Sequence, residues 1–329
     1  MNEVKAVLCT VQYDESRLEK ISRAFAPAPV YFYKPHDSEG IRSVIQKVDV
    51  AVLDSDLNDL ILEGKNLRWI HCSHSGLTKS ARKEVFDRKI ILSGAAGRSA
   101  PSLAEHALFF ALSFTFDVYR LHEAQKEHNW ERFAKQYANS RGLNGKTMGI
   151  IGFGNTGQAL AKRAKALDMR VLVYSRSVRE KSEFVDEYYA MDKGENFDTL
   201  LRESDFLVLC CHLSDETYHM LGVKQFAMMK NTTVLINMAR GGVVDEKALY
   251  QALKDRIIAG AGCDVFDQEP LPSDSPLWDL PNIMITPHMT PRVPSISDSA
   301  LNILLDNVER YKKGEPIRNR LSERDMYTK

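Results

Sequence analysis

Three glycines have the spacing of a phosphate-binding turn. Gly152, Gly154 and Gly157 form the pattern G-x-G-x-x-G in the stretch GIIGFGNTG. A strand-like run (147–151) precedes the pattern and a helical run from Asn155 follows it, which is the context that the pattern requires. Gly152 would allow a tight turn, Gly154 would let a pyrophosphate approach the backbone, and Gly157 would let helix and strand pack closely. Because N–H groups at a helix start attract phosphates, the stretch predicts a dinucleotide-binding turn; an ordinary glycine-rich turn is the alternative.

The next strand-like run ends on two hydroxyls and a cation. The residues VLVY (171–174) are followed by Ser175, Arg176 and Ser177. A carboxylate at this position would accept hydrogen bonds from the adenosine ribose and would repel a 2′-phosphate. Ser175 removes that repulsion, and Arg176 adds a fork of donors that suits a phosphate. We therefore expect NADP(H) to be preferred over NAD(H); a solvated Arg176 with NAD(H) in the site is the alternative.

Three polar residues follow successive strand-like runs further along the chain. Arg240 comes just after VLIN, Glu269 lies in the loop after IIAGAG, and His288 comes just after IMIT. Because ligands bind beyond the carboxyl ends of the strands in an open parallel sheet, these side chains can converge. Arg240 would grip a carboxylate or polarise a carbonyl, and His288 would deliver a proton to the oxygen while hydride arrives at carbon. With Glu269 to orient the imidazole, the set suits the reduction of a 2-oxo acid.

Short apolar runs alternate with helical patterns in both halves of the chain, which is typical of parallel sheets covered by helices on both faces. The strand-like runs are 5–9, 30–33, 50–53, 67–72, 90–93, 147–151, 171–174, 206–211, 234–237, 257–262 and 283–286. Residues 102–130 contain no Gly or Pro and predict one long helix, either a core helix or part of a subunit interface. A final amphipathic helix (299–316) stops at a glycine.

The pattern predicts an α/β protein with two doubly wound parallel-sheet domains, Rossmann and flavodoxin-like. We expect the cofactor domain to be inserted within the substrate domain. The substrate domain would contain 1–99 and 290–329, and the nucleotide-binding domain 100–289.

Together these motifs resemble the D-isomer-specific 2-hydroxyacid dehydrogenase family over nearly the whole chain. The resemblance rests on GIIGFGNTGQALAKRAKAL, LSDET, VLINMARGGVVDEKAL, GAGCDVFDQEPLP and TPHM. It implies that Arg240 binds the substrate, that Glu269 is the partner of the histidine, and that His288 is the acid–base. It further implies an active site in the cleft between two domains and a homodimer built on an arm at about 102–140. The branch it suggests is that of NADP-preferring glyoxylate and hydroxypyruvate reductases.

The resemblance also assigns roles to residues that the spacing alone does not single out. Asp264 matches a carboxylate near the nicotinamide amide, and Ser75 and Gly76 match a loop whose N–H groups bind the substrate carboxylate; a plain cap and a plain turn are the alternatives. The expected cofactor contacts are Gly152, Phe153, Gly154, Asn155, Thr156, Gly157, Ser175, Arg176, Ser177, Cys211, His212, Thr217, Met238, Ala239, Arg240, Asp264 and His288. The expected substrate contacts are Ser75, Gly76, Arg240 and His288.

Several positions depart from the family's pattern. His212 stands where a proline is common, Met289 follows the expected acid–base residue, and His74 adjoins the substrate loop. The stretch GAAG (94–97) replaces an N-x-x-G motif. These departures bear on substrate preference, because none of them removes a catalytic group.

Composition excludes several classes of partner. The 329 residues carry no formal net charge, so no strong attraction to nucleic acid or an anionic membrane is expected. The apolar runs are too short to span a bilayer, and the first residues do not resemble a signal peptide. The five cysteines have no metal-type spacing and predict reduced thiols, so we expect a cytoplasmic protein without a bound metal.

The sequence therefore predicts an NADPH-dependent reductase that converts a small 2-keto acid reversibly to a D-2-hydroxy acid. A dinucleotide-sensing corepressor on the same fold is the alternative, since a fold alone does not settle function. Formate dehydrogenation is disfavoured, because that branch has Gln where this chain has Glu269. The sequence leaves open which keto acid is used, in which direction the reaction runs, and the roles of His74, His212 and Met289.

Overall fold

The structure is a computed structural model that describes residues 2–130, 142–178, 182–290, 293 and 295–329. The chain forms two compact units. Unit 1 contains Met1–Ser99, Ser214–Glu216 and Arg292–Lys329, and unit 2 contains Ala100–Leu213 and Thr217–Pro291.

In the residues of unit 1 that the structure describes there are five strands: Val7–Cys9 (β1), Val30–Phe32 (β2), Val50–Leu53 (β3), Trp69–Cys72 (β4) and Ile91–Gly94 (β5). They form one parallel sheet in the order β2-β1-β3-β4-β5. This is the flavodoxin-like order, in which the winding reverses between β1 and β3. The helices of unit 1 are Glu15–Phe25 (α1), Ser38–Val44 (α2), Asp59–Leu62 (α3), Lys83–Asp87 (α4) and Ile296–Lys313 (α12), with a 3₁₀ turn at Glu323–Asp325.

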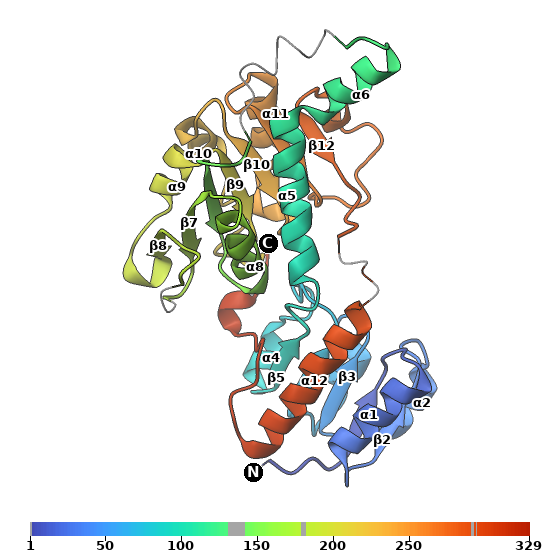
Figure 1. Ribbon diagram of the computed structural model, residues 1–329. Coiled ribbons are helices and arrows are strands. Elements are labelled where there is room, and N and C mark those ends of the chain that lie inside the picture. Colours follow the sequence, from blue (N-terminus) through green and yellow to red (C-terminus); the bar gives the residue numbers. More distant parts are fainter. Residues whose placement is uncertain (1, 131–141, 179–181, 291–292, 294) are drawn as a thin grey trace. The chain divides into compact units, whose positions relative to one another are not determined.

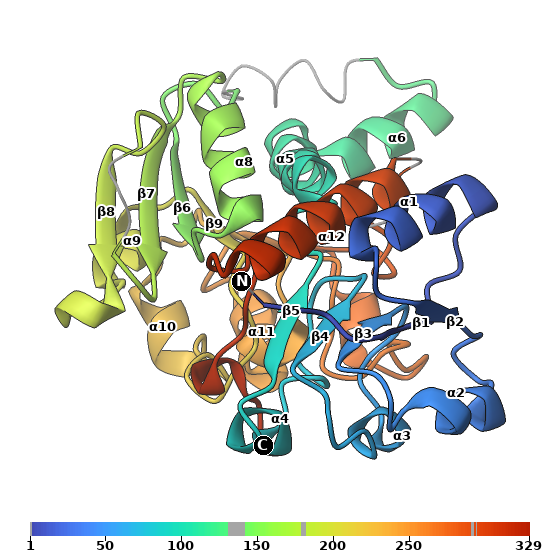
Figure 2. The same cartoon turned by 90° about the horizontal axis from the view of Figure 1, so that it is seen from below.

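Helices cover both faces of this sheet, which explains why its central strands are continuous apolar runs. α12 lies beside α1 on one face (Figures 1 and 2). There Leu304 and Val308 of α12 pack with Trp69 of β4. On the other face Ile41 of α2 and Val85 of α4 pack with the opposite side of the same strands. The last helix of the chain thus belongs to the core of its first domain.

The described part of unit 2 contains seven strands: Thr147–Ile151 (β6), Arg170–Ser175 (β7), Glu187–Ala190 (β8), Phe206–Leu209 (β9), Val234–Asn237 (β10), Gly260–Cys263 (β11) and Ile283–Ile285 (β12). They form a parallel sheet in the order β12-β11-β10-β9-β6-β7-β8, which is the Rossmann order with one added strand. The helices among its described residues are Ala100–Phe116 (α5), Val118–Lys126 (α6), Asn155–Lys165 (α8), Asp198–Glu203 (α9), Val223–Met228 (α10) and Glu246–Lys254 (α11). Short 3₁₀ turns lie at Met191–Lys193, Gly241–Val243 and Pro276–Asp279.

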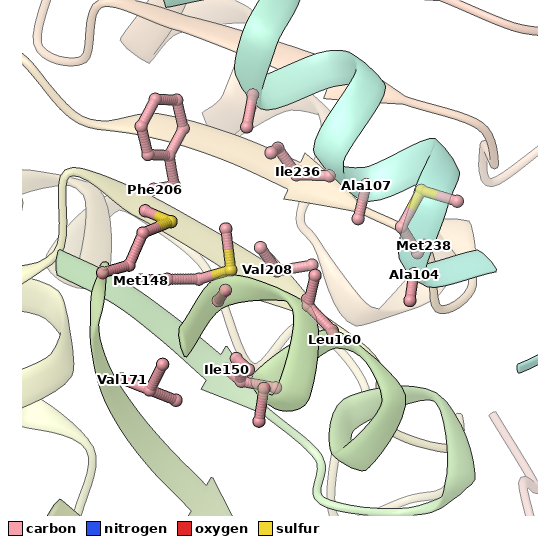
Figure 3. Packing of buried hydrophobic residues seen from close by; sticks show 14 of the residues in the cluster. Ala104, Ala107, Met148, Ile150, Leu160, Val171, Phe206, Val208, Ile236 and Met238 are labelled. Atoms are coloured by element: carbon pink, nitrogen blue, oxygen red, sulfur yellow. The ribbon is translucent and has the colours of Figure 1, made fainter. Parts of the chain in front are cut away.

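The core of unit 2 joins α5 and α8 to the sheet. Figure 3 shows Ala104 and Ala107 of α5 in the same cluster as Leu160 of α8 and Ile150 of β6. Alanines along both helices let them approach closely. Gly262 of β11 likewise leaves room for an aromatic ring of α5, because a Cβ there would lie 2.5 Å from Cγ of Phe110. This packing explains the nearly all-apolar first half of 102–130.

The predicted fold class is confirmed, but two elements differ from expectation. The prediction of one helix over 102–130 is wrong, because Asp117 adopts a left-handed backbone (φ +47°) and separates α5 from α6. Aspartate tolerates this conformation better than most residues, so no glycine marks the break. β8 was not predicted, because Glu187–Ala190 is only partly buried and lacks an apolar run.

Candidate active site

The glycine-rich turn between β6 and α8 leaves space beside its backbone. Gly152 has φ +99°, and a Cβ there would lie 2.5 Å from the amide nitrogen of Cys211. A Cβ on Gly157 would lie 2.1 Å from the carbonyl oxygen of Gly152, so the helix start packs directly on the turn. A Cβ on Gly154 would meet no atom within 4 Å. The turn therefore needs glycine at 152 and 157 for its own packing, and the open side lies at Gly154.

The start of α8 offers N–H groups toward that open side. Gly154 is the N-cap residue and makes no side-chain capping bond. Within the described residues, the amides of Thr156 and Gly157 donate to no group. Unpaired amides at a helix N-terminus attract phosphate. The residues present therefore fit the pyrophosphate of a dinucleotide.

The end of β7 is organised by hydroxyl groups. Ser175 is buried, and its Oγ donates to the carbonyl of Ser177 at 2.8 Å and also contacts the hydroxyl of Tyr188. The Tyr188 hydroxyl donates to the same carbonyl at 2.9 Å. Arg176 lies between the two serines, and its carbonyl accepts from the amide of Asp192 at 3.0 Å. Among the described residues, no carboxylate occupies the strand end itself, although Asp192 is close to it.

Arg240 follows β10 in a turn that a buried asparagine holds in place. The Oδ1 of Asn237 accepts from the amide of Ala239 at 3.1 Å, and its Nδ2 donates to the carbonyl of Arg240 at 3.2 Å. The Nη1 of Arg240 donates to the carbonyl of Ala239 at 2.7 Å. A Cβ on Gly241 would lie 1.9 Å from the carbonyl carbon of Phe266. The Arg240 turn therefore lies directly against the loop that leads to Glu269.

His288 and Glu269 form a hydrogen-bonded pair. Nδ1 of His288 lies 2.7 Å from Oε2 of Glu269, and the other carboxylate oxygen accepts from the amide of Phe266 at 3.0 Å. Each side chain is about one-third exposed, at 36% and 35%. His288 has φ +48°, a strained conformation for a non-glycine residue that is characteristic of functional sites. Glu269 thus fixes the orientation of the imidazole and leaves Nε2 for another partner.

Asp264 lies beneath the segment that carries His288. Its side chain is buried, and Oδ1 accepts from Oγ1 of Thr286 at 2.5 Å and from the amide of Met289 at 3.1 Å. Oδ2 accepts from Oγ1 of Thr290 at 2.8 Å. Both oxygens therefore hold residues on either side of His288, which is a positioning role that sequence reasoning did not assign to Asp264.

His106 of α5 completes this network. Its Nδ1 contacts the hydroxyl of Thr290, and its Nε2 lies 3.3 Å from the hydroxyl of Thr286. The ring stacks on Phe110 at 4.6 Å between centroids. Burial lowers the pKa of His106, and the Asp264 carboxylate opposes that shift. Sequence reasoning missed His106, Asn237 and both threonines, because only the fold brings α5 beneath the segment after β12.

The remaining predicted cofactor positions cluster around the same sheet edge. Thr217 donates from Oγ1 to the carbonyl of His212 at 2.7 Å, which closes the loop after β9. Met238 and Ala239 are buried in the turn before Arg240. The structure therefore places the predicted residues of unit 2 in the loops that follow β6, β7, β9, β10, β11 and β12.

The predicted substrate loop lies in unit 1, after β4. Gly76 has φ +78°, which favours glycine. The amides of Ser75 and Gly76 donate to no group in the part of the chain that the structure describes. His74 contacts the carbonyl of Ser75 through Nδ1 at 3.2 Å and lies 3.8 Å from Oδ1 of Asp56. The loop therefore presents two consecutive unpaired N–H groups.

The stretch GAAG packs tightly against that loop. A Cβ on Gly94 would lie 2.9 Å from the carbonyl oxygen of His74. Asn319, near the end of the chain, donates from Nδ2 to the carbonyls of Gly94 at 3.1 Å and Ala96 at 2.8 Å. Asn319 therefore holds the stretch 94–97 in place, although this stretch lacks the asparagine of the family's N-x-x-G motif.

Comparison with known proteins identifies the class to which this fold and site belong. Residues 108–290 match the family model described as the NAD binding domain of D-isomer specific 2-hydroxyacid dehydrogenases. Glyoxylate reductase of Korarchaeum cryptofilum is 37% identical over 318 residues, which cover 94% of this chain and 93% of that protein. The chain belongs to the D-isomer specific 2-hydroxyacid dehydrogenase family.

Two further proteins are similar to this chain. Hydroxypyruvate reductase of Thermotoga maritima is 36% identical over 259 residues, which cover 77% of this chain and 81% of that protein. A D-isomer specific 2-hydroxyacid dehydrogenase from Xanthobacter autotrophicus, solved with NADPH and MES, has the same fold with a TM-score of 0.80. That protein is 24% identical, and the match covers 98% of this chain and 99% of that one.

The chain is therefore an NAD(P)-dependent dehydrogenase of 2-hydroxy acids, which catalyses the reduction of 2-keto acids. Its cofactor is a nicotinamide dinucleotide. Among the described residues, no helix has the length and apolar character needed to cross a membrane.

Proposed function

We propose that this protein reduces a small 2-keto acid to the D-2-hydroxy acid with NADPH. The observation that carries the proposal is the His288–Glu269 pair, 2.7 Å apart, beside the loop that bears Arg240. The resemblance to glyoxylate reductase and hydroxypyruvate reductase supports a small substrate.

His288 acts as the proton donor. When bound, the reduced nicotinamide supplies the hydride that C2 of the keto acid accepts. Nδ1 of His288 is hydrogen-bonded to Glu269, so Nε2 is the nitrogen that donates a proton to the carbonyl oxygen. The hydrogen bond to Glu269 holds the ring in one orientation while Nε2 gives up its proton.

Arg240 of unit 2 and the loop Ser75–Gly76 of unit 1 each carry donors that suit an acid. The guanidinium of Arg240 has the donor geometry for a carboxylate or a carbonyl oxygen. The unpaired amides of Ser75 and Gly76 suit a carboxylate oxygen. Substituting Arg240 or His288 removes interactions that strengthen in the transition state, so either change should lower kcat/KM by orders of magnitude.

The preference for NADPH is the part of the proposal that concerns the end of β7. Ser175 places no negative charge at the ribose, and Arg176 provides the cation for the 2′-phosphate. The double variant Ser175→Asp and Arg176→Ala should shift the ratio of kcat/KM values toward NADH by tenfold or more. Arg202→Ala, an exposed arginine of α9, is the matched control. An unchanged ratio in the double variant would exclude this site.

The proposed reaction is tested with a panel of 2-keto acids, each assayed with NADPH and with NADH at the nicotinamide absorbance. We expect turnover of at least one small 2-keto acid and conversion to the D isomer. Turnover should fall by orders of magnitude in His288→Asn with the Kd for NADPH retained. A His288→Asn enzyme that is as active as the wild type would refute the proposed acid–base role.

We further propose a homodimer built on the arm at about 102–140, which includes α5 and α6; its residues 131–140 lie outside the described ranges. Large apolar side chains are exposed along this arm, including Phe109 at 49% and Tyr119 at 54%. An exposed apolar patch of this kind is typical of a protein interface. Sedimentation should give twice the 37.3 kDa chain mass, and Phe109→Glu should shift it toward the monomer. Phe32→Glu, at an exposed site of unit 1, should leave the dimer intact.

A cytoplasmic location is also part of the proposal. All five cysteines are free thiols, and three are buried. A reducing compartment keeps such thiols unpaired. Fractionation of cells that express the native chain should place it with the soluble cytoplasmic enzymes.

A further inference from the structure

Unit 1 contains a half-buried guanidinium that forms no ion pair within the described residues. Arg98 follows β5, and its Nη1 donates to the carbonyl of Ser73 at 2.5 Å. Its Nε is buried and has no hydrogen-bond partner among the described residues. Tyr13 and Asp54 act on the guanidinium of Arg98 electrostatically. Neither the phenol of Tyr13 nor the carboxylate of Asp54 forms an ion pair or a hydrogen bond with it.

An arginine in this situation is costly to keep. Arginine is rarely buried without a partner, because removing its charge from water loses hydration energy. Burial lowers the pKa of Arg98, although the guanidinium remains charged at any physiological pH. An arriving anion would offset this cost.

Arg98 lies at the edge of the sheet where ligands bind in this kind of fold. It follows β5, Ser73 follows β4, and Tyr13 follows β1, so the three residues come from the carboxyl ends of the strands. The hydroxyl of Tyr13 lies 2.8 Å from Oγ of Ser73. The winding of the sheet reverses between β1 and β3, which is where ligands bind in open parallel sheets.

The same two loops contain other unsatisfied polar atoms. Buried polar atoms normally have a hydrogen-bond partner, so a group of exceptions requires an explanation. The buried atoms without one, in these loops and within the described ranges, are His74 Nε2, Thr78 Oγ1, Arg98 Nε and Ser99 Oγ. His74 and Thr78 flank Ser75 and Gly76 in the chain, whose amides are also unpaired among the described residues, and Arg98 reaches the same loop through the carbonyl of Ser73. The loops therefore present more donors than one carboxylate can use.

We propose that Arg98 selects 2-keto acids that carry a second anionic group, either a second carboxylate or a phosphate. The proposal rests on the proposed reaction, in which the amides of Ser75 and Gly76 bind the first carboxylate. Glyoxylate and hydroxypyruvate have no second charge and leave Arg98 unpaired. A dianionic acid places its second group against the guanidinium, which binds carboxylates and phosphates bidentately.

The kinetic test compares substrates that differ in the second group. Oxaloacetate and 2-ketoglutarate represent the dicarboxylic acids, phosphohydroxypyruvate the phosphorylated ones, and pyruvate and hydroxypyruvate the monoanions. The wild type should favour at least one dianion by tenfold or more in kcat/KM, and the favoured compound identifies the second group. Arg98→Gln should raise KM for that dianion by more than tenfold and change the values for monoanions by less than threefold.

Two further variants separate recognition from loop support. Arg98→Lys retains the charge but not the fork, so it should recover part of the selectivity. Arg42→Gln, an exposed arginine of α2, should match the wild type. Equal losses for monoanions and dianions in Arg98→Gln, or a wild type that favours monoanions, would overturn the proposal.

A binding measurement separates this proposal from the reaction itself. Calorimetry with tartronate, a dianionic 2-hydroxy acid, and with glycolate, its monoanionic counterpart, requires no turnover. Tartronate should bind the wild type more tightly, and Arg98→Gln should abolish the difference. If no keto acid is reduced but this difference is found, the proposed function fails and the Arg98 site stands. If keto acids are reduced but tartronate binds the wild type and Arg98→Gln equally well, the Arg98 proposal is wrong and the proposed function is unaffected.

Discussion

Gly154→Ala separates the fold of the phosphate turn from its binding of the cofactor. Because a Cβ at this position meets no atom within 4 Å and the backbone has φ −77°, alanine fits without strain. Replacing the N-cap glycine costs a few tenths to about 1 kcal/mol, and the reduced entropy of the unfolded chain offsets about 0.4–1 kcal/mol. The free energy of unfolding should therefore change by less than about 1 kcal/mol.

The same methyl group occupies the space that a pyrophosphate needs. A displaced phosphate loses one or both charge-assisted hydrogen bonds to the amides of Thr156 and Gly157. One such bond contributes about 1.5–3 kcal/mol, which corresponds to a roughly ten- to hundredfold increase in Kd. The Kd for NADPH is measured by nicotinamide fluorescence, and unfolding by urea titration.

Gly157→Ala is the matched control, because its Cβ would lie 2.1 Å from the carbonyl oxygen of Gly152. That variant should be destabilised before any cofactor is added. Gly154→Ala with the Kd of the wild type would refute the assignment of the pyrophosphate to this turn. If the Gly154→Ala protein were as unstable as the Gly157→Ala protein, the conclusion that a Cβ at position 154 has free space around it would be wrong.

Three further predictions follow from the contacts of single side chains. Thr290→Val removes the hydroxyl that donates to buried Asp264, so we expect a loss of about 1–3 kcal/mol in unfolding free energy and a lower kcat. Thr290→Ser keeps the hydroxyl, so it should retain the wild-type free energy of unfolding and kcat. An unchanged kcat in the valine variant would argue against the positioning role of Asp264. In Glu269→Gln the hydrogen bond that orients His288 loses its charge, so kcat should fall by about tenfold or more while the Kd for NADPH is retained; a wild-type kcat would contradict this. Burial lowers the pKa of His71 to about 3, so the folded protein keeps this imidazole neutral at a pH where the unfolded chain protonates it. The resulting contribution to the free energy of unfolding is fully present above about pH 6.5. It should fall by up to about 1.4 kcal/mol for each pH unit of acidification below that. His71→Asn should have a shallower slope in urea titrations at pH 7, 6 and 5, and identical slopes would refute this.

The sequence predicted the fold class because its strands are continuous apolar runs. Each central strand of a parallel sheet is covered on both faces, so runs such as VAVL at 50–53 are unambiguous. Edge strands give a weaker signal, and β8 was missed for that reason. The break at Asp117 was missed because a single left-handed residue needs no glycine or proline.

The candidate site was predictable where chemistry restricts the residue type. Glycines 152 and 157 are fixed by backbone contacts, and Glu269 and His288 follow strand ends in the expected order. The supporting residues were not predictable. His106 lies 158 positions before Asp264, and no local pattern in the sequence relates them. A histidine in an apolar helix is usually a core residue, and only the contacts with Thr286 and Thr290 distinguish it.

Helix α5 has two different surfaces within one turn. Phe109 is about half exposed, and its ring centroid lies 5.8 Å from that of His106, which faces the segment of His288. If a second copy of the chain covers Phe109, a change at that interface can move the ring of Phe109 and the adjacent ring of His106. Because His106 contacts the segment that carries His288, self-association and proton transfer are then linked. Dilution would then alter turnover per chain as well as mass, and an inhibitor bound at this helix would act without competing with keto acid or nucleotide.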